Sequence, residues 1–302
     1  MMSPLTRRRL LGTALALPVA SAAQAAAPML GASTATYRRF LLGQFEVTTI
    51  LAGARTVPDP HNIFGLNVDA ETFSAAAAAA NIPDDRARFY FTPTVVNTGP
   101  ELVLFDTGLN GQGITDALAG AGYTPDQIDV VVITHMHGDH IGGLMTDGAP
   151  TFPNARYVTG GVEFDHWAGA GNDRFDTNVR PLADRMTMLN SAGNVTSGIT
   201  ARAAFGHTPG HMTYMLESNG QTLLIAADFA NHYVWSLAYP DWEVKFDIDK
   251  QAAAATRRRT LDMLAADKIP FIGYHMPFPS VGYVQTREGG YAYVPESYQL
   301  QL

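Results

Sequence analysis

The sequence predicts a single α/β domain, because short apolar runs typical of strands alternate with segments of helical spacing along the chain. The chain has 302 residues, 46% of them hydrophobic, which is enough for one sizeable core. Residues 38–302 contain no charge block, proline-rich linker or repeat that would divide them. The expected organisation is therefore one domain over residues 28–302, preceded by a targeting segment at 1–27.

The targeting segment resembles a twin-arginine export signal. Arg7 and Arg8 precede an apolar stretch at 10–20, and small residues follow at 21–27, where cleavage is expected. A membrane anchor would need a longer apolar span than this one. The mature protein is therefore expected in the periplasm or outside the cell.

The strands and helices of the body can be assigned from periodicity. A strand is expected at 45–51, and two more lie between 95 and 105 around a Gly-Pro turn. The alanine run at 75–80 predicts a lightly packed helix that ends before Pro83. Further strands are expected at 130–133, 155–159, 200–205, 212–217 and 221–226, and helices at 113–120, 161–168, 178–190 and 249–267. Arg257, Arg258 and Arg259 fall in the last helix and are expected on its solvated face.

The composition of the body restricts its partners and its chemistry. Loss of residues 1–27 would remove three arginines and no acidic residue, which changes the formal net charge from −8 to −11 and argues against nucleic acid as a partner. No apolar run of about 18 residues follows the first thirty positions, so the mature chain is expected to have no membrane span. Cysteine is absent, so any metal must be bound by His, Asp and Glu.

The segment 134–143, Thr-His-Met-His-Gly-Asp-His-Ile-Gly-Gly, follows the apolar run 130–133 and contains four residues of metal-ligand type. His135 and His137 are two apart, so an extended backbone would direct both to the same side, where they can bind one ion. Asp139 and His140 lie on the turn that follows and point elsewhere. A second ion nearby would explain them, because one small cation cannot comfortably take four ligands from six consecutive residues.

Other ligand-type residues recur at the ends of expected strands, where an α/β sheet usually presents its site. His207 and His211 lie in the turn-rich segment Gly-His-Thr-Pro-Gly-His, Asp228 follows the apolar run 223–227, and His275 follows 269–274.

In combination, these motifs resemble the metallo-β-lactamase superfamily in its dinuclear form, over residues 40–275. The resemblance implies an αββα sandwich in which His135, His137 and His207 bind one divalent ion. It also implies that Asp139, His140 and His275 bind a second ion and that Asp228 bridges the two. Zinc is the expected metal, and manganese, iron or cobalt would suit the same ligands. The resemblance further implies that Asp106 orients ligands, while His211 is expected to support the site or cap its turn rather than bind an ion.

The resemblance implies hydrolysis of a small-molecule ester, lactone or phosphotriester by a metal-bound hydroxide, with Asp139 as a proton acceptor. The chain is similar to the methyl parathion hydrolase group of exported hydrolases in its export signal, in the segments 43–48 and 134–144, and in Trp167. The chain departs from that group at 231–235. Acyl-homoserine lactonases typically have a tyrosine three residues after the bridging aspartate, where this chain has Asn231, and Tyr233 could substitute for it.

Four aromatic side chains are candidates to wall an apolar substrate pocket over the metals: Trp167, His232, Tyr233 and Trp235. A place in the core is the alternative for Trp235. Three alternative functions are kept: acyl-homoserine lactonase, mononuclear-iron persulfide oxygenase and non-catalytic metal-binding protein. A homodimer is left open.

Overall fold

Two seven-stranded sheets form the centre of the part of the chain that the computed structural model describes, residues 29–301. The predicted signal segment, residues 1–27, lies outside this range. The sheets and the helices described below belong to the unit that begins at Thr34. No helix among the described residues is long and apolar enough to cross a bilayer.

The first sheet has the strand order β1-β2-β5-β6-β7-β10-β11. Its strands are β1 (Tyr37–Leu42), β2 (Phe45–Ile50), β5 (Thr94–Asn97), β6 (Leu102–Phe105), β7 (Val130–Ile133), β10 (Arg156–Gly160) and β11 (Met186–Leu189). The first four form an antiparallel meander, whereas β6, β7, β10 and β11 run parallel to one another.

The second sheet follows chain order from β12 to β18. Its strands are β12 (Ala192–Thr196), β13 (Ile199–Ala203), β14 (Met212–Ser218), β15 (Gln221–Ala227), β16 (Phe271–Gly273), β17 (Val281–Arg287) and β18 (Gly290–Pro295). Only β15 and β16 are parallel in this sheet, and the helix α6 (Lys250–Asp267) lies between them in the chain. Such a crossover is required because parallel neighbours cannot be joined by a tight turn.

The strands are apolar on both faces because each face is covered. Alternation along β6 and β7 sends Val103 and Val132 into a core between the two sheets, while Leu104 and Val131 enter a second core on the outer side of the first sheet. In β15, Leu223 faces the inter-sheet core. Its neighbour in the chain, Leu224, packs with residues of α6 on the outer side of the second sheet.

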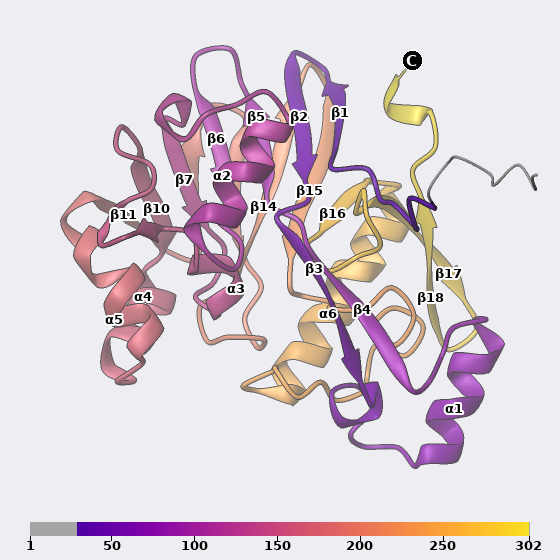
Figure 1. Cartoon of the computed structure of the whole chain (residues 1–302). Helices are drawn as coiled ribbons and strands as arrows, with labels where there is room; N and C mark the ends of the chain where they lie inside the picture. The colour runs from indigo at the N-terminus through magenta and orange to yellow at the C-terminus, as the bar shows by residue number, and fades with distance from the viewer. Residues whose placement is uncertain (1–28, 302) are drawn as a thin grey trace, which may run out of the picture. The chain divides into compact units, whose positions relative to one another are not determined.

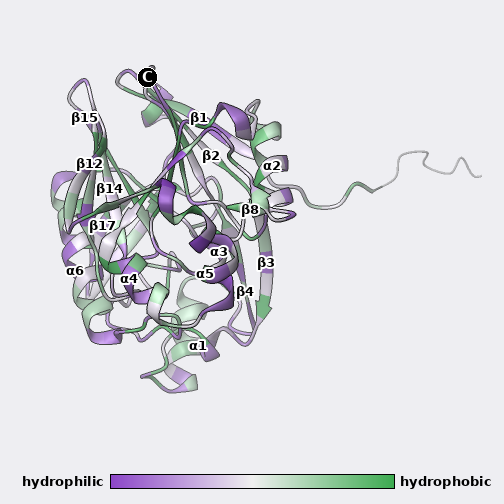
Figure 2. Cartoon of the chain, turned by 90° about the vertical axis from the view of Figure 1, so that its left-hand side faces the viewer, coloured by the Kyte–Doolittle hydropathy of each residue, from purple (hydrophilic) through white to green (hydrophobic). Residues whose placement is uncertain are grey.

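Helices complete the outer layers (Figure 1). The outer core of the first sheet includes side chains of α2 (Gly111–Gly120), α4 (Gly161–Gly169) and α5 (Asp173–Asn178). In Figure 2 the outward-facing α5 is largely hydrophilic, as its sequence requires. The expected α/β class and αββα sandwich are confirmed.

A two-stranded antiparallel sheet, which is a hairpin with a long connection, lies outside the two large sheets together with a helix. The strands β3 (Gly53–Pro58) and β4 (Arg86–Phe91) pair with each other, and α1 (Ala70–Ala79) lies between them in the chain. Phe73, Ala76 and Ala77 of α1 are buried against Phe89 and Trp235. The alanine helix therefore contributes to a core, although its exposed face agrees with the lightly packed helix expected there. Short elements complete the fold: α3 (Gly138–Ile141), β8 (Met145–Thr146), β9 (Ala149–Pro150) and 3₁₀ turns at 60–62, 125–127, 180–185 and 299–301.

Most of the expected elements are present with shifts of a few residues at their ends. The helix expected at 178–190 was wrong: α5 ends at Asn178, a 3₁₀ turn follows, and Met186–Leu189 forms the edge strand β11. Parallel pairing with β10 stabilises this segment as a strand, and local periodicity does not report such pairing.

Candidate metal centre

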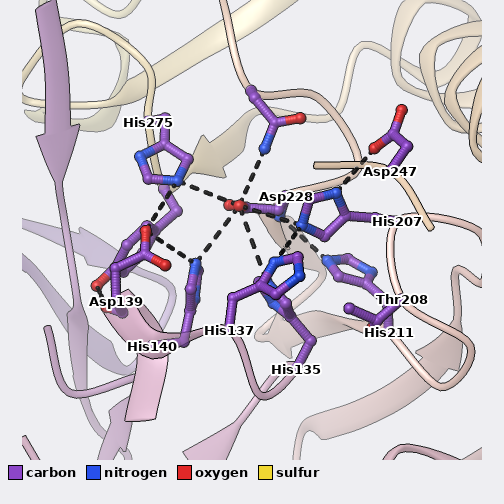
Figure 3. A network of polar contacts seen from close by, with 12 residues as sticks. His135, His137, Asp139, His140, His207, Thr208, His211, Asp228, Asp247 and His275 are labelled. Atoms are coloured by element: carbon purple, nitrogen blue, oxygen red, sulfur yellow. Dashed lines mark hydrogen bonds and ion pairs between the residues drawn. The ribbon is translucent and has the colours of Figure 1, made fainter. Parts of the chain in front are cut away.

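The candidate ligands gather at one end of the two sheets because strand ends deliver them there. Asp106 follows β6 and Thr134-His135 follows β7, two parallel strands of the first sheet. In the second sheet, Asp228 follows β15 and His275 lies just past β16, again a parallel pair. The carboxyl ends of neighbouring parallel strands meet at one edge, so these side chains converge. Figure 3 shows three of them, His135, Asp228 and His275, pointing toward one another.

Three imidazoles form the first group of candidate ligands. His135 Nε2 lies 3.1 Å from His137 Nδ1, and His207 Nε2 lies 3.0 Å from the same atom. His135 and His207 are fully buried. Burial, followed by the neighbouring His207, lowers the pKa of His137 to about 3, and burial also lowers the pKa of His135 well below its usual value, so these two rings are neutral and present lone pairs. Three converging lone pairs suit a divalent cation.

Asp139, His140 and His275 form the second group of candidate ligands. Asp139 Oδ2 lies 3.3 Å from His275 Nε2 and 3.8 Å from His140 Nε2. Although burial alone would raise the pKa of Asp139, His140 and His275 lower it to about 2. The carboxylate is therefore ionised, as a metal ligand must be.

Asp228 lies between the two groups (Figure 3). Its Oδ2 atom is 3.1 Å from His275 Nε2, 3.5 Å from His140 Nε2 and 3.5 Å from His207 Nε2. Two buried atoms of the centre, Asp228 Oδ1 and His140 Nε2, have no hydrogen-bond partner among the described residues. Buried polar atoms normally have partners, so this donor set fits two divalent ions, which His140 and Asp228 would help to hold.

Carboxylate and carbonyl oxygens fix the tautomers of three ligand imidazoles. Nδ1 of His140 donates to Asp106 Oδ2 at 2.9 Å, and Nδ1 of His275 donates to the Tyr90 carbonyl at 2.8 Å. Nδ1 of His207 donates to Asp247 Oδ1 at 2.8 Å. In each ring, Nε2 is left free to bind an ion. Asp106 thus lies where it can orient the His140 ring, and its orienting role stays a prediction.

The sequence analysis did not predict that Asp247 contacts His207, or that Arg257 contacts Asp247. Arg257 Nη2 donates to Asp247 Oδ2 at 2.8 Å, and its other nitrogens donate to the carbonyls of Phe229, Pro240 and Trp242. Only 1% of Arg257 is exposed. The expected solvated face is therefore wrong for Arg257, although it holds for Arg258, which forms an exposed ion pair with Asp241.

Glu163 is a second missed residue, and it ties the two ligand loops together. Its carboxylate is fully buried and accepts four hydrogen bonds, from Met136 N, Trp167 Nε1, Thr208 Oγ1 and Gly210 N. Gly210 must be glycine, because a Cβ there would lie 2.1 Å from the Glu163 backbone nitrogen. In the sequence, Glu163 is an acidic residue inside an expected helix. Acidic residues in helices are usually exposed, so the sequence pattern did not indicate that Glu163 is buried.

His211 belongs to none of the candidate metal groups. Its Nε2 accepts a hydrogen bond from the backbone N–H of Asp228 at 3.1 Å. The residue before Asp228, Ala227, has a φ of 47°, a strained conformation for a residue with a Cβ. His211 thus holds the turn that carries Asp228, which agrees with a supporting role.

A cavity of about 380 Å³ opens over the ligands. Its apolar walls consist of Val57, Ile63, Phe89, Phe91, Leu109 and Phe246, and its polar lining comprises Arg55, Arg174 and the centre itself. None of the four aromatic residues expected in this pocket lines it. Trp167 donates to Glu163 behind His137, while His232, Tyr233 and Trp235 line a second cavity of about 220 Å³.

The hairpin β3–β4 separates the two cavities. Alternation along β4 directs Phe89 and Phe91 to the cavity over the ligands, whereas Arg88 and Tyr90 face the second cavity. His275 lines both cavities, with its ring edge-on to Phe89 and Phe91. The pocket expectation failed because the hairpin supplies the aromatic wall in place of the segment 231–235.

A model of the metallo-beta-lactamase superfamily matches residues 92–272, which is more than half of the chain. The chain belongs to the metallo-β-lactamase superfamily. As a superfamily member it is similar to the N-acyl homoserine lactonase AttM of Agrobacterium fabrum (strain C58), with 29% identity over 39% of this chain and 48% of that one. It is also similar to the uncharacterised protein YobT of Bacillus subtilis (strain 168), with 30% identity over 42% and 57%. The chain thus spans about half the length of these curated relatives.

Solved metallo-β-lactamase-like structures share the whole fold. AidC, a dizinc quorum-quenching lactonase in complex with a product, superposes with a TM-score of 0.80 at 23% identity, covering 87% of this chain and 98% of that one. The hydrolase AbOPH of the beta-lactamase superfamily superposes with a TM-score of 0.81 at 22% identity, covering 89% of this chain and 100% of that one. At such identities the likeness establishes the fold alone.

Proposed function

We propose that this protein is a dinuclear metal-dependent hydrolase of lactones or esters with an apolar acyl or aryl part. The observation that carries the proposal is the position of Asp228 Oδ2 between the two ligand groups, at the floor of an apolar cavity. Bound divalent ions, with zinc proposed first, would lower the pKa of a water toward neutrality and polarise the carbonyl under attack. His135, His137 and His207 would hold one ion, Asp139, His140 and His275 the other, and Asp228 both.

Residues of the cavity would position the substrate and the groups that react with it. The apolar walls of the cavity exclude water from the substrate's acyl or aryl part, and Phe89 and Phe91 confine His275. Asp139 lines the cavity and its side chain is 24% exposed, so it can hold the proton released when the nucleophile forms. Tyr274 donates to the Asp139 carbonyl at 2.6 Å and fixes its backbone.

A lactone is proposed as the first substrate, because AttM and AidC are both described as lactonases. The tyrosine that acyl-homoserine lactonases typically have after the bridging aspartate is not replaced here. Asn231 Nδ2 donates to Asp228 Oδ2 at 3.0 Å, and Tyr233 lines the second cavity. Any hydrogen bond from a side chain to the substrate must therefore come from another part of the cavity wall.

The test is turnover by the chain from residue 28, loaded with zinc, on acyl-homoserine lactones, simple lactones, aryl esters and methyl parathion. Hydrolysis of lactones or esters that is lost on chelation and restored by zinc is expected, with about two metals per chain. Absence of turnover on every substrate would refute the proposal. About one iron per chain would favour the oxygenase alternative instead.

Export is a separate proposal, and it rests on Arg7, Arg8 and the apolar stretch at 10–20. The mass of the chain recovered from the periplasm should lack about the first 27 residues. Replacement of both arginines by lysine should retain the precursor inside the cell.

A further inference from the structure

We propose that Arg55 and Arg174 recognise an anionic group, and that the preferred substrates are esters or lactones that also carry a carboxylate. This inference rests on the proposed hydrolytic function and specifies its substrate class. The cavity over the metal centre is lined by apolar residues, by residues of the centre and by these two arginines. No Ser, Thr or Tyr side chain lines it.

Arg174 is an exposed residue whose side chain lies beside the metal centre. It lies on α5, and its chain passes over Gly138, the residue between the candidate ligands His137 and Asp139. A Cβ on Gly138 would lie 2.7 Å from Arg174 Cδ, so a larger residue would displace the arginine. Among residues 29–301, the guanidinium reaches only the Gly138 carbonyl, at 3.4 Å from Nη1, which leaves most of its donors without a partner in this part of the chain.

Arg55 reaches the same cavity from the hairpin. It lies directly opposite Phe89 in the β3–β4 register, and so it shares the cavity-facing side with Val57. The neighbouring Arg88 faces the second cavity and donates to Thr56. Within residues 29–301, neither Arg55 nor Arg174 has a carboxylate within 4.0 Å, whereas Arg180, close to Arg174 in the chain, pairs with Asp176.

The charge of the cavity favours an anion. Asp139 and Asp228 are the only carboxylates of the described residues that line it, and two divalent ions would exceed their combined charge. The arginines then add positive charge to this cavity in a chain whose formal net charge is −8. Unpaired guanidinium groups suit carboxylate because they match its geometry with two parallel donors. The apolar walls, among them Phe89 and Phe246, leave room for the rest of the substrate.

The experiment compares 4-acetoxybenzoate with its neutral methyl ester, methyl 4-acetoxybenzoate, on the zinc-loaded chain from residue 28. Wild-type protein should have the higher kcat/KM on the anionic ester. R174Q and R55Q should each lower the ratio of kcat/KM for the anionic ester to kcat/KM for the neutral ester by about tenfold. R174K should retain part of the preference. R202Q is the matched control, since Arg202 is exposed on β13 and lines a different surface.

Ionic strength gives a second readout, because salt screens the attraction between the arginines and an anionic substrate. KM for the anionic ester should rise with salt in wild type and not in the double variant R55Q/R174Q. Equal effects of the variants on both esters, or no wild-type preference for the anion, would overturn the inference.

Failure of the proposed hydrolase would be recognised separately, since wild type would then turn over neither ester. Calorimetric binding of 4-hydroxybenzoate and of methyl 4-hydroxybenzoate to the zinc-loaded protein then decides the inference. Tighter binding of the anion that R174Q and R55Q abolish would support it, and equal affinity for the two ligands would refute it.

Discussion

Arg257 and Asp247 form a buried ion pair, 2.8 Å long, on the side of His207 that faces away from the metal centre. The pair connects α6 to the loop before it, which also carries Phe246 of the cavity wall. One cation from a run of three arginines therefore fixes both a candidate ligand and part of the substrate cavity.

R257M should lower the free energy of unfolding by about 3–5 kcal/mol, because it leaves a buried carboxylate and three backbone carbonyls without their donor. R258Q is the matched control in the same run. It removes an exposed pair with Asp241 and should cost less than about 1 kcal/mol. Denaturant unfolding measures both, and equal effects of the two variants would contradict the assigned positions.

D247A should weaken metal binding about 10–100-fold, because His207 loses the acceptor that fixes its tautomer and orientation. Competition with a chelator of known affinity measures the change. The loss should appear in one of the two binding steps, since His140 and His275 keep their own acceptors. D241A, which changes an exposed aspartate, should leave both steps unaltered. Unchanged affinity in D247A would exclude this role for Asp247.

E163Q should destabilise the protein by about 2–5 kcal/mol, because an amide nitrogen cannot accept and two buried donors lose their partner. W167F removes one donor and leaves the carboxylate with three, so its cost should be about 1 kcal/mol. Thermal unfolding with matched metal content compares them. A larger effect for W167F than for E163Q would show that packing of the indole, rather than the carboxylate, holds the loops together.

The metal-free protein should lose stability as the pH rises from about 6.5 to 10. Burial alone would lower the pKa of His275, but Asp228 and Asp139 raise it from 6.5 to about 10. A raised histidine pKa contributes stability that is complete below the unfolded value of 6.5 and is lost as the pH passes through the folded value. The lowered pKa of Asp139, about 2 against 3.8, acts at the acid end, where stability is lost below pH 3.8.

Unfolding of the chelator-treated protein between pH 5 and 10 measures this dependence, and H275N should reduce the alkaline fall, while His140, whose pKa Asp228 and Asp106 raise against the effect of burial, keeps the rest. The zinc-loaded protein should show little of it, because the ions displace the protons from the ligand nitrogens. Stability of the metal-free protein that is level or rises between pH 6.5 and 9 would refute the prediction.

The sequence predicted the sandwich, and it indicated that the candidate ligands lie near one another, because both depend on local patterns. The strand 130–133 is apolar throughout, and four candidate ligands follow it within seven residues. Loop residues at strand ends have few alternative positions, so His207, Asp228 and His275 could be placed from their context. The structure brings all of these side chains to one centre.

The residues that support the centre could not be predicted in this way. Asp247 meets His207 across 40 positions, and Glu163 meets Thr208 across 45. Neither partner can be identified from periodicity or composition, because each contact depends on how separate segments approach after the sheets have formed. The same reason explains the error over the pocket, since the hairpin faces the ligands only through tertiary packing.

The hairpin is joined to the metal centre chiefly through main-chain and ring-edge contacts, as His275 Nδ1 donates to the carbonyl of Tyr90 rather than to a side chain. Since every residue supplies that carbonyl, this hydrogen bond would survive replacement of the side chains around it, although the ring-edge contacts of Phe89 and Phe91 would not. Under the proposed function, exchange of the cavity-facing side chains of residues 53–58 and 86–91 would therefore reshape the cavity and leave this main-chain link to His275 in place.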